Sequence, residues 1–297
     1  MFLADLFGIV LNFLYNFFGN YGIAIIIFSV FLRLILMPLT FSQQKSMKKT
    51  GEIQGQLKAI QDKYKNNPEK LNQETMELYK REKINPFSGC LSAIIQIFII
   101  LSVFWLVSSP LTHMKNVQNT DTYKQYSEKV SENKNQRASY KEIAMINLIE
   151  SDYKEIENKL NQENIENKDE LLNQKQELEK LRINMDFLGL DLSKVPTQSL
   201  NDFKVYIIPI LYVISSFVSI KITSNNQNKK SNNQISETDP MQNMGKGMTY
   251  MMPIMSVSIA IVAPLGLALY WFISNTLMIL ERLIINKITD LQDSKNA

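Results

Sequence analysis

Hydrophobic residues in this chain gather in five long blocks. Strongly polar segments separate the first four blocks, whereas only the short turn Ala263-Pro264-Leu265-Gly266 separates the fourth from the fifth. A helix needs about 20 mostly apolar residues to cross the hydrocarbon core of a bilayer. Each block approaches this length, so an all-α membrane protein with five transmembrane helices is the expected fold class. We place the spans at 19–40, 86–107, 204–222, 247–263 and 265–286.

The first 18 residues are apolar but contain three polar positions, Asp5, Asn12 and Asn16, near one helical face. They lack the basic start and the small-residue cleavage pattern of a signal peptide. Residues 1–18 are therefore predicted to form an amphipathic helix that lies in the membrane interface.

Residues 41–85 show helical periodicity with one apolar stripe on a charged background. The stripe is interrupted at Asn67-Pro68, and asparagine is a favourable N-cap when proline occupies the first helical position. This pattern predicts two helical arms, and hence a helical hairpin.

The longest polar segment, 108–203, carries two apolar stripes joined near 161–168. Each stripe indicates a helix, and the two helices are expected to pack as an antiparallel pair. The pair is interpreted either as a structural appendage or as a docking site for a partner. Residues 223–246 are rich in Asn and Ser and are expected to form a cytoplasmic loop, and 287–297 a cytoplasmic tail.

The charge of the loops predicts the orientation in the membrane. Residues 41–85 hold ten Lys and Arg against six acids, whereas 108–203 hold thirteen against seventeen. Basic loops remain in the cytoplasm. The hairpin is therefore expected inside and the 108–203 segment outside, with the N-terminus outside and the C-terminus cytoplasmic.

Arg33 lies in the middle of the first predicted span. A charged side chain at the centre of a bilayer costs roughly 2.5–3.5 kcal/mol on insertion scales, so it is expected to face a cavity or a partner. No Asp or Glu is expected at the same depth, since Glu281 falls in the last turns of the fifth span beside Arg282. We therefore expect Arg33 to be unpaired and to face a water-filled cavity.

Other polar residues recur at four-residue spacing in the predicted spans. Positions i and i+4 share one face of a helix. Such strips on several helices predict a hydrophilic groove among the five spans, although a single serine in a membrane helix commonly serves packing. The candidate groove residues are Arg33 with Ser29, Ser92 with Gln96, Ser215 with Ser219, and Trp271 with Asn275.

The remaining chemistry of the sequence is sparse. Cys90 is the only cysteine and His113 the only histidine, which excludes an internal disulfide and a multi-histidine metal site. No Walker-type phosphate-binding motif occurs. We therefore expect no cofactor and no enzymatic activity.

Several local motifs are distributed over roughly residues 1–110 and 185–290. The motifs are Gly19-Asn20-Tyr21-Gly22, Phe31-Leu32-Arg33, Met37-Pro38-Leu39-Thr40, Leu78-Tyr79-Lys80, Glu82 to Pro86, Gly89-Cys90 with Gln96, Phe187 to Leu192, Asp239 to Gln242, Met252-Pro253, Pro264 to Trp271, and Ser274-Asn275. In sequence and in order they resemble YidC-type membrane protein insertases, of the oxidase-assembly/YidC family and its Gram-positive-like branch.

The resemblance implies a five-helix insertase in the bacterial cell membrane, a chaperone that inserts and helps fold nascent membrane proteins. It implies that Arg33 is the groove arginine, with Trp271 near it. On this basis we hypothesise that Arg33 captures the polar tail of a substrate. Implied partners are nascent membrane proteins and the lipid bilayer, with the ribosome, the signal recognition particle receptor and the Sec translocon, and no specific nucleic acid. The chain departs from the family pattern in its long 108–203 segment and in having Ile220 before Lys221.

Two other classes of function remain as alternatives. A transporter of small solutes or anions would use Arg33 as a substrate ligand, but it predicts an internal repeat or broken helices in corresponding halves, and neither is visible in the sequence. A passive assembly scaffold would instead depend on the helical pair within 108–203.

Overall fold

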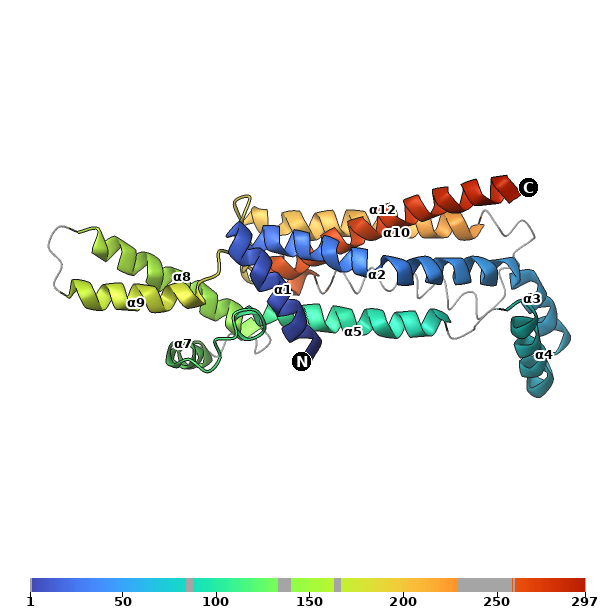
Figure 1. Cartoon of the computed structure of the whole chain (residues 1–297), viewed down its shortest axis with the longest axis horizontal. Coiled ribbons are helices and arrows are strands. Elements are labelled where there is room, and N and C mark those ends of the chain that lie inside the picture. Colours follow the sequence, from blue (N-terminus) through green and yellow to red (C-terminus); the bar gives the residue numbers. More distant parts are fainter. Residues whose placement is uncertain are drawn as a thin grey trace. The chain divides into compact units, whose positions relative to one another are not determined.

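The computed structural model describes residues 2–83, 88–132, 140–162, 167–228, 258 and 260–296, which are mostly helical (Figure 1). The helices are α1 (Phe2–Phe18), α2 (Tyr21–Glu52), α3 (Gln54–Lys63), α4 (Pro68–Arg81), α5 (Ser88–Ser108), α6 (Pro110–His113), α7 (Asp121–Ser131), α8 (Lys141–Leu160), α9 (Lys168–Leu181), η2 (Pro196–Gln198), η3 (Phe203–Tyr206), α10 (Ile207–Asn228) and α12 (Leu265–Asn296), and the strands are β1 (Asp186–Phe187) and β2 (Leu190–Asp191).

The chain folds into two compact units, and the long helices α2, α5, α10 and α12 each contribute residues to both. The first unit comprises Met1–Phe31, Ile99–Ser216 and Tyr250–Thr276, and the second comprises Leu32–Phe98, Phe217–Thr249 and Leu277–Ala297.

Three helical segments in the described part of the chain are long and apolar enough to cross a membrane: Tyr21–Ser42, Phe203–Ile222 and Leu265–Ile285. They coincide with the first, third and fifth expected spans. The described part of α5 contains a shorter apolar stretch, Ile94–Ser108, where the second span is expected. Most of the expected fourth span, 247–263, lies outside the described residues.

Helix α2 continues through Pro38 to Glu52, so the first span and the start of the 41–85 segment belong to one helix. Beyond it, α3 and α4 pack against each other around Ile53 and Leu78, in the second unit. The side chain of Asn67 accepts a hydrogen bond from the Lys70 amide at 3.1 Å. The predicted N-cap is therefore confirmed.

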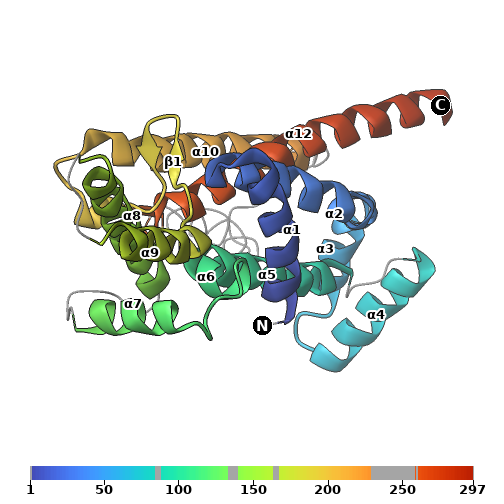
Figure 2. The same ribbon diagram turned by 60° about the vertical axis from the view of Figure 1, so that its left-hand side comes forward.

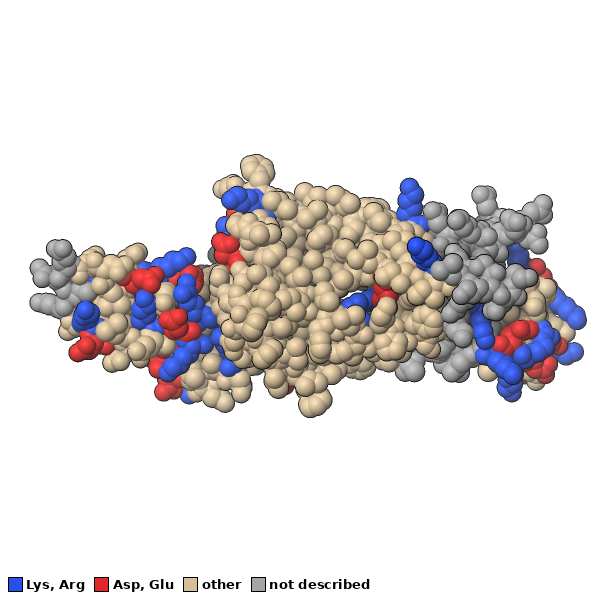
Figure 3. Space-filling model, turned by 45° about the horizontal axis from the view of Figure 1, so that its top comes forward, with Lys and Arg blue, Asp and Glu red and all other residues tan. Residues whose placement is uncertain are grey.

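The segment 108–203 contains the predicted antiparallel helical pair, α8 and α9 (Figures 1 and 2). Two ion pairs join them, Glu150 with Arg182 and Glu157 with Lys175. The later residue of α8 pairs with the earlier residue on the α9 side, which shows that the helices run antiparallel. Figure 3 shows intermixed acidic and basic side chains over this helical pair. The predicted apolar stripes form its core, which includes Ile143, Ile146, Ile149, Tyr153, Ile156, Leu178 and Leu181.

Two features of this segment are not predicted from the sequence. Helix α7 packs against α8 and α9 as a third helix, and these three helices are called the arm below. The strands β1 and β2 form a small antiparallel hairpin whose turn residues, Leu188 and Gly189, both have positive φ. The expectation of two helices is therefore incomplete.

The loop after this hairpin holds the start of α12. The amides of Leu265 and Gly266 donate to the carbonyls of Lys194 and Leu192, each at 2.9 Å. The first amides of a helix have no partner within the helix, so these bonds satisfy two of them. The loop is itself braced by an ion pair between Lys194 and Asp202 at 2.8 Å.

Helix α10 extends to Asn228 and so continues into the segment 223–246, which is predicted as a loop. Residues 223–228 are therefore helical, and the cytoplasmic position of the segment stays a prediction. Residues 229–246 lie outside the described part of the chain.

Candidate functional site

Arg33 forms an ion pair with Glu281, an acid of α12 that is not expected at its depth. The Nε atom of Arg33 lies 2.5 Å from Oε2 of Glu281, and both residues belong to the second unit. The expectation of an unpaired arginine is therefore wrong. Pairing reduces the cost of removing each charge from water, which is large for an isolated ion in an apolar environment.

The Arg33–Glu281 pair is largely buried, but some of its polar atoms lack hydrogen bonds. The side chains of Arg33 and Glu281 are 17% and 4% exposed. The close Nε–Oε2 contact lacks the alignment of a hydrogen bond, and neither carboxylate oxygen of Glu281 accepts one from any described residue. Charge attraction, and not an aligned hydrogen bond, therefore joins the Nε atom of Arg33 to Glu281.

A second polar cluster lies in the first unit, between α10 and α12. The side-chain amide of Asn275 donates to the hydroxyls of Ser215 at 2.9 Å and Ser216 at 3.3 Å. Both hydroxyls in turn donate to the carbonyl of Tyr212. The ring of Trp271 lies 6.1 Å from the ring of Tyr212. The structure thus brings together Ser215, Trp271 and Asn275, which are predicted separately from the sequence.

The other candidate residues have different environments. Ser29 is buried, and its hydroxyl donates to the carbonyl of Ile25 in the preceding turn, as serines in membrane helices commonly do. Ser219 is buried and Gln96 is exposed. The side chain of Ser92 lies outside the described part.

Three residues of these clusters are not predicted as contacts from the sequence. Glu281 is excluded as a partner of Arg33 in the sequence analysis because of its expected depth. Ser216 and Tyr212 belong to none of the polar strips at four-residue spacing, so the sequence gives no signal for them. Among the described residues, no group of three or more His, Cys, Asp or Glu side chains could hold a metal ion. The chemistry that these contacts support is recognition of polar and charged groups.

Comparison with known proteins places the chain in a family. The family described as 60Kd inner membrane protein matches residues 13–293. The chain belongs to this family. With its apolar helices, the family match makes the chain a multi-pass membrane protein.

Similar individual proteins carry the name membrane protein insertase YidC. One from Caldanaerobacter subterraneus subsp. tengcongensis is 44% identical over 100 residues, which are 34% of this chain and 48% of that protein. One from Chloroherpeton thalassium is 43% identical over 102 residues, 34% of this chain and 17% of that protein. These alignments span half or less of the relatives' length. The resemblance to YidC-type insertases is confirmed.

Proposed function

We propose that this chain is a membrane protein insertase and chaperone, which inserts nascent integral membrane proteins into the lipid bilayer and helps them fold. The observation that carries the proposal is the family match over residues 13–293, together with relatives that are named as insertases. The ion pair of Arg33 supports it, because a charged contact among apolar helices is a feature of functional sites.

In the proposed mechanism, the short polar tail of a substrate displaces Glu281 from Arg33. Two unit charges 4 Å apart attract by roughly 4 kcal/mol at an effective dielectric constant near 20. A tail carboxylate gains about this much from Arg33, but the system loses a similar attraction from Glu281. The exchange is therefore nearly balanced, which makes capture reversible and allows release.

The remaining candidate residues are proposed to line the same hydrophilic groove. Hydroxyl and amide groups can hydrate the tail with hydrogen bonds while it lies at membrane depth. The bonds that Asn275 already makes with Ser215 and Ser216 support this role, since hydroxyls and amides can exchange partners. The proposed groove residues are Ser29, Arg33, Ser92, Gln96, Ser215, Ser219, Trp271 and Asn275.

The energy for insertion is proposed to come from the substrate. Transfer of apolar surface from water into an apolar medium yields about 25 cal/mol for each Å². A substrate helix that slides from the groove into lipid therefore moves downhill without nucleotide hydrolysis. The chain then acts as a catalyst of transfer only in the physical sense, with no covalent chemistry.

The proposed topology places the N-terminus outside and the C-terminus in the cytoplasm of a bacterial cell. The basic segment 41–85 is then cytoplasmic, where it would receive nascent chains from the ribosome, the signal recognition particle receptor or the Sec translocon. The arm formed by α7, α8 and α9 is then outside.

An insertion assay separates the insertase from a passive scaffold. Purified chain in proteoliposomes is expected to protect a single-span substrate from added protease, whereas empty liposomes do not. A variant with 155–173 replaced by a short glycine-serine linker removes the far end of the arm but keeps Glu150 and Arg182. We expect this variant to retain most of the insertion activity. If the full chain is active and the shortened variant is not, the scaffold is favoured. If the full chain protects no more substrate than empty liposomes do, the insertase proposal is contradicted.

A further inference from the structure

A polar pocket lies in the first unit, between the end of α1 and the base of the arm. Its volume is about 310 Å³. The pocket is separate from Arg33 and from the Asn275 cluster, because it shares no residue with them. Its lining residues are Tyr15, Gly19, Lys115, Glu179, Arg182 and Asn184.

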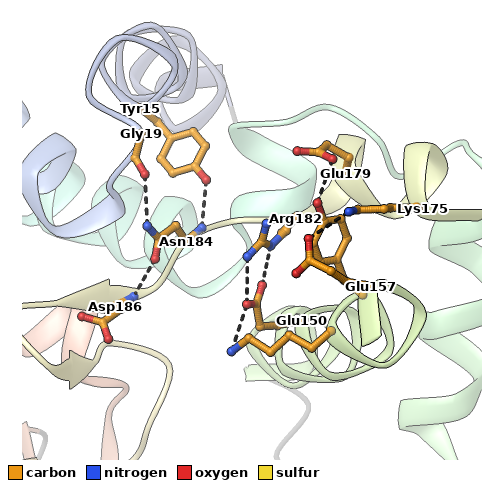
Figure 4. A network of polar contacts seen from close by, with 11 residues as sticks. Tyr15, Gly19, Glu150, Glu157, Lys175, Glu179, Arg182, Asn184 and Asp186 are labelled. Atoms are coloured by element: carbon orange, nitrogen blue, oxygen red, sulfur yellow. Dashed lines mark hydrogen bonds and ion pairs between the residues drawn. The ribbon is translucent and has the colours of Figure 1, made fainter. Parts of the chain in front are cut away.

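Most polar groups of the pocket are already bound (Figure 4). Arg182 makes two bonds to Glu150, at 2.6 and 3.0 Å. The Asn184 side chain donates to the carbonyl of Gly19 and accepts from the amide of Asp186. These bonds fix the side chains of Arg182 and Asn184, so this side of the pocket is already ordered without a ligand.

Two charged groups in the lining, Lys115 and Glu179, form no ion pair in the described part of the chain, although Glu179 and Arg182 attract each other at longer range. Lys115 has its ammonium 4.8 Å from the ring centre of Tyr15, and no ion pair in the described part of the chain involves it. Burial lowers the pKa of Lys115, because no nearby carboxylate compensates for the lost hydration. Glu179 accepts one bond from the Tyr153 hydroxyl and makes no described ion pair. The pocket therefore offers one cation and one carboxylate that are not paired with each other.

The Tyr15 hydroxyl adds a hydrogen-bond donor. Its oxygen accepts a bond from the Asn184 amide at 2.8 Å, which leaves its proton for another acceptor. A ligand with an anionic oxygen could therefore contact both the Lys115 ammonium and the Tyr15 hydroxyl, while a cationic group contacts Glu179.

The position of the pocket along the chain indicates where such a ligand comes from. Gly19 lies two residues before Tyr21, where the first candidate span begins, so we infer that the pocket lies near the level of lipid headgroups. The adjacent end of α1 exposes Phe17 and Phe18, whose rings pack edge to face and are 76% and 41% exposed. Two exposed aromatic side chains therefore directly precede Gly19 of the pocket lining, and acyl chains can contact them.

We propose that this pocket binds the headgroup of an aminophospholipid, with the phosphate on Lys115 and Tyr15 and the primary ammonium on Glu179. The ligand anchors the end of α1 to the base of the arm. It belongs to the leaflet on the side of α8 and α9, and under the proposed topology this is the outer leaflet.

Binding is testable by native mass spectrometry of the full-length protein in detergent, titrated with phosphatidylethanolamine or phosphatidylglycerol. We expect phosphatidylethanolamine to be retained more strongly. Lys115→Gln is expected to weaken its binding about tenfold, the effect of losing one charge-assisted bond. Lys115→Arg should retain binding, and Lys124→Gln, which changes an exposed lysine of α7, should not alter it.

Glu179→Gln provides a second arm that leaves the fold intact, because Glu179 is exposed. It is expected to abolish the preference for phosphatidylethanolamine over phosphatidylglycerol. Glycerophosphoethanolamine, the soluble headgroup, should bind far more weakly than the lipid. Equal lipid binding by wild type and Lys115→Gln would overturn the site, and equal binding of the soluble headgroup would overturn its assignment to a lipid.

Discussion

Replacing Arg33 with alanine is expected to reduce insertion of a single-span substrate with an acidic tail by at least about tenfold. The substitution removes the cation that holds the tail, and it leaves Glu281 buried beside the entering carboxylates. Breaking a buried pair costs roughly 3–5 kcal/mol when one charge stays uncompensated. The attraction between Arg282 and Glu281 offsets part of that cost here. The measurement is protease protection of the substrate in proteoliposomes, normalised to the amount of folded chain.

A double variant separates the loss of tail binding from the loss of stability that an unpaired Glu281 causes. Arg33→Ala with Glu281→Gln restores neutrality and should restore stability, but it should not restore insertion of the acidic substrate. Glu281→Gln alone leaves Arg33 without its competitor, so insertion should be retained or increased. Arg33→Lys tests whether charge suffices or the guanidinium geometry is needed. Full activity of the double variant would contradict tail capture by Arg33.

Replacing Gly8 with alanine is expected to destabilise the first unit, although alanine favours helices. A Cβ atom at Gly8 would overlap the carbonyl oxygen of His113 in α6, so α1 must move away. Such overpacking costs about 3 kcal/mol. The gain in helix propensity is only about 1 kcal/mol. The displacement also breaks the 2.6 Å contact between Asp5 and His113.

The expected readout is a lower midpoint of thermal unfolding in detergent, by about 4 °C for a net loss near 2 kcal/mol. Gly55→Ala is the matched control, because a Cβ atom at this position of α3 would meet no neighbouring atom within 4 Å. That variant should be unchanged or slightly stabilised. If Gly8→Ala behaves like Gly55→Ala, the close packing of α1 on α6 is wrong.

Features encoded by local periodicity are predictable from the sequence. The stripe that includes Ile146 and Ile149 forms the core of the arm, and Asn67 caps α4. Three of the expected spans also match helices that are long and apolar enough to cross a membrane. These features depend on spacing within one helix, which the sequence displays directly.

Features that depend on tertiary contacts are not predictable in this way. The strands β1 and β2 have two residues each, which is too short for an alternating pattern. The pocket at Lys115 combines residues from α1 and from the base of the arm, far apart in sequence. Only folding brings these side chains together.

The pairing of Arg33 with Glu281 lies between these cases. Arg33 is 12 residues after the start of α2 at Tyr21, and Glu281 is 16 residues after the start of α12 at Leu265. Four residues correspond to about 6 Å along a helix, a distance that two long side chains can bridge. Comparing only the backbone depths of Arg33 and Glu281, without the length of their side chains, therefore wrongly excludes Glu281 as the partner.

Charge-dependent cross-linking tests whether Arg33 binds the substrate tail. In a Cys90→Ala background, Met37→Cys places one thiol four residues after Arg33 on α2, at a side chain that is 37% exposed. A substrate with one cysteine in its tail is arrested during insertion and oxidised. We predict several-fold more disulfide for a tail with aspartates than for the same tail with asparagines, and no difference after Arg33→Ala. Equal yields for the two tails, or a difference that persists without Arg33, would show that Arg33 does not hold the tail by its charge.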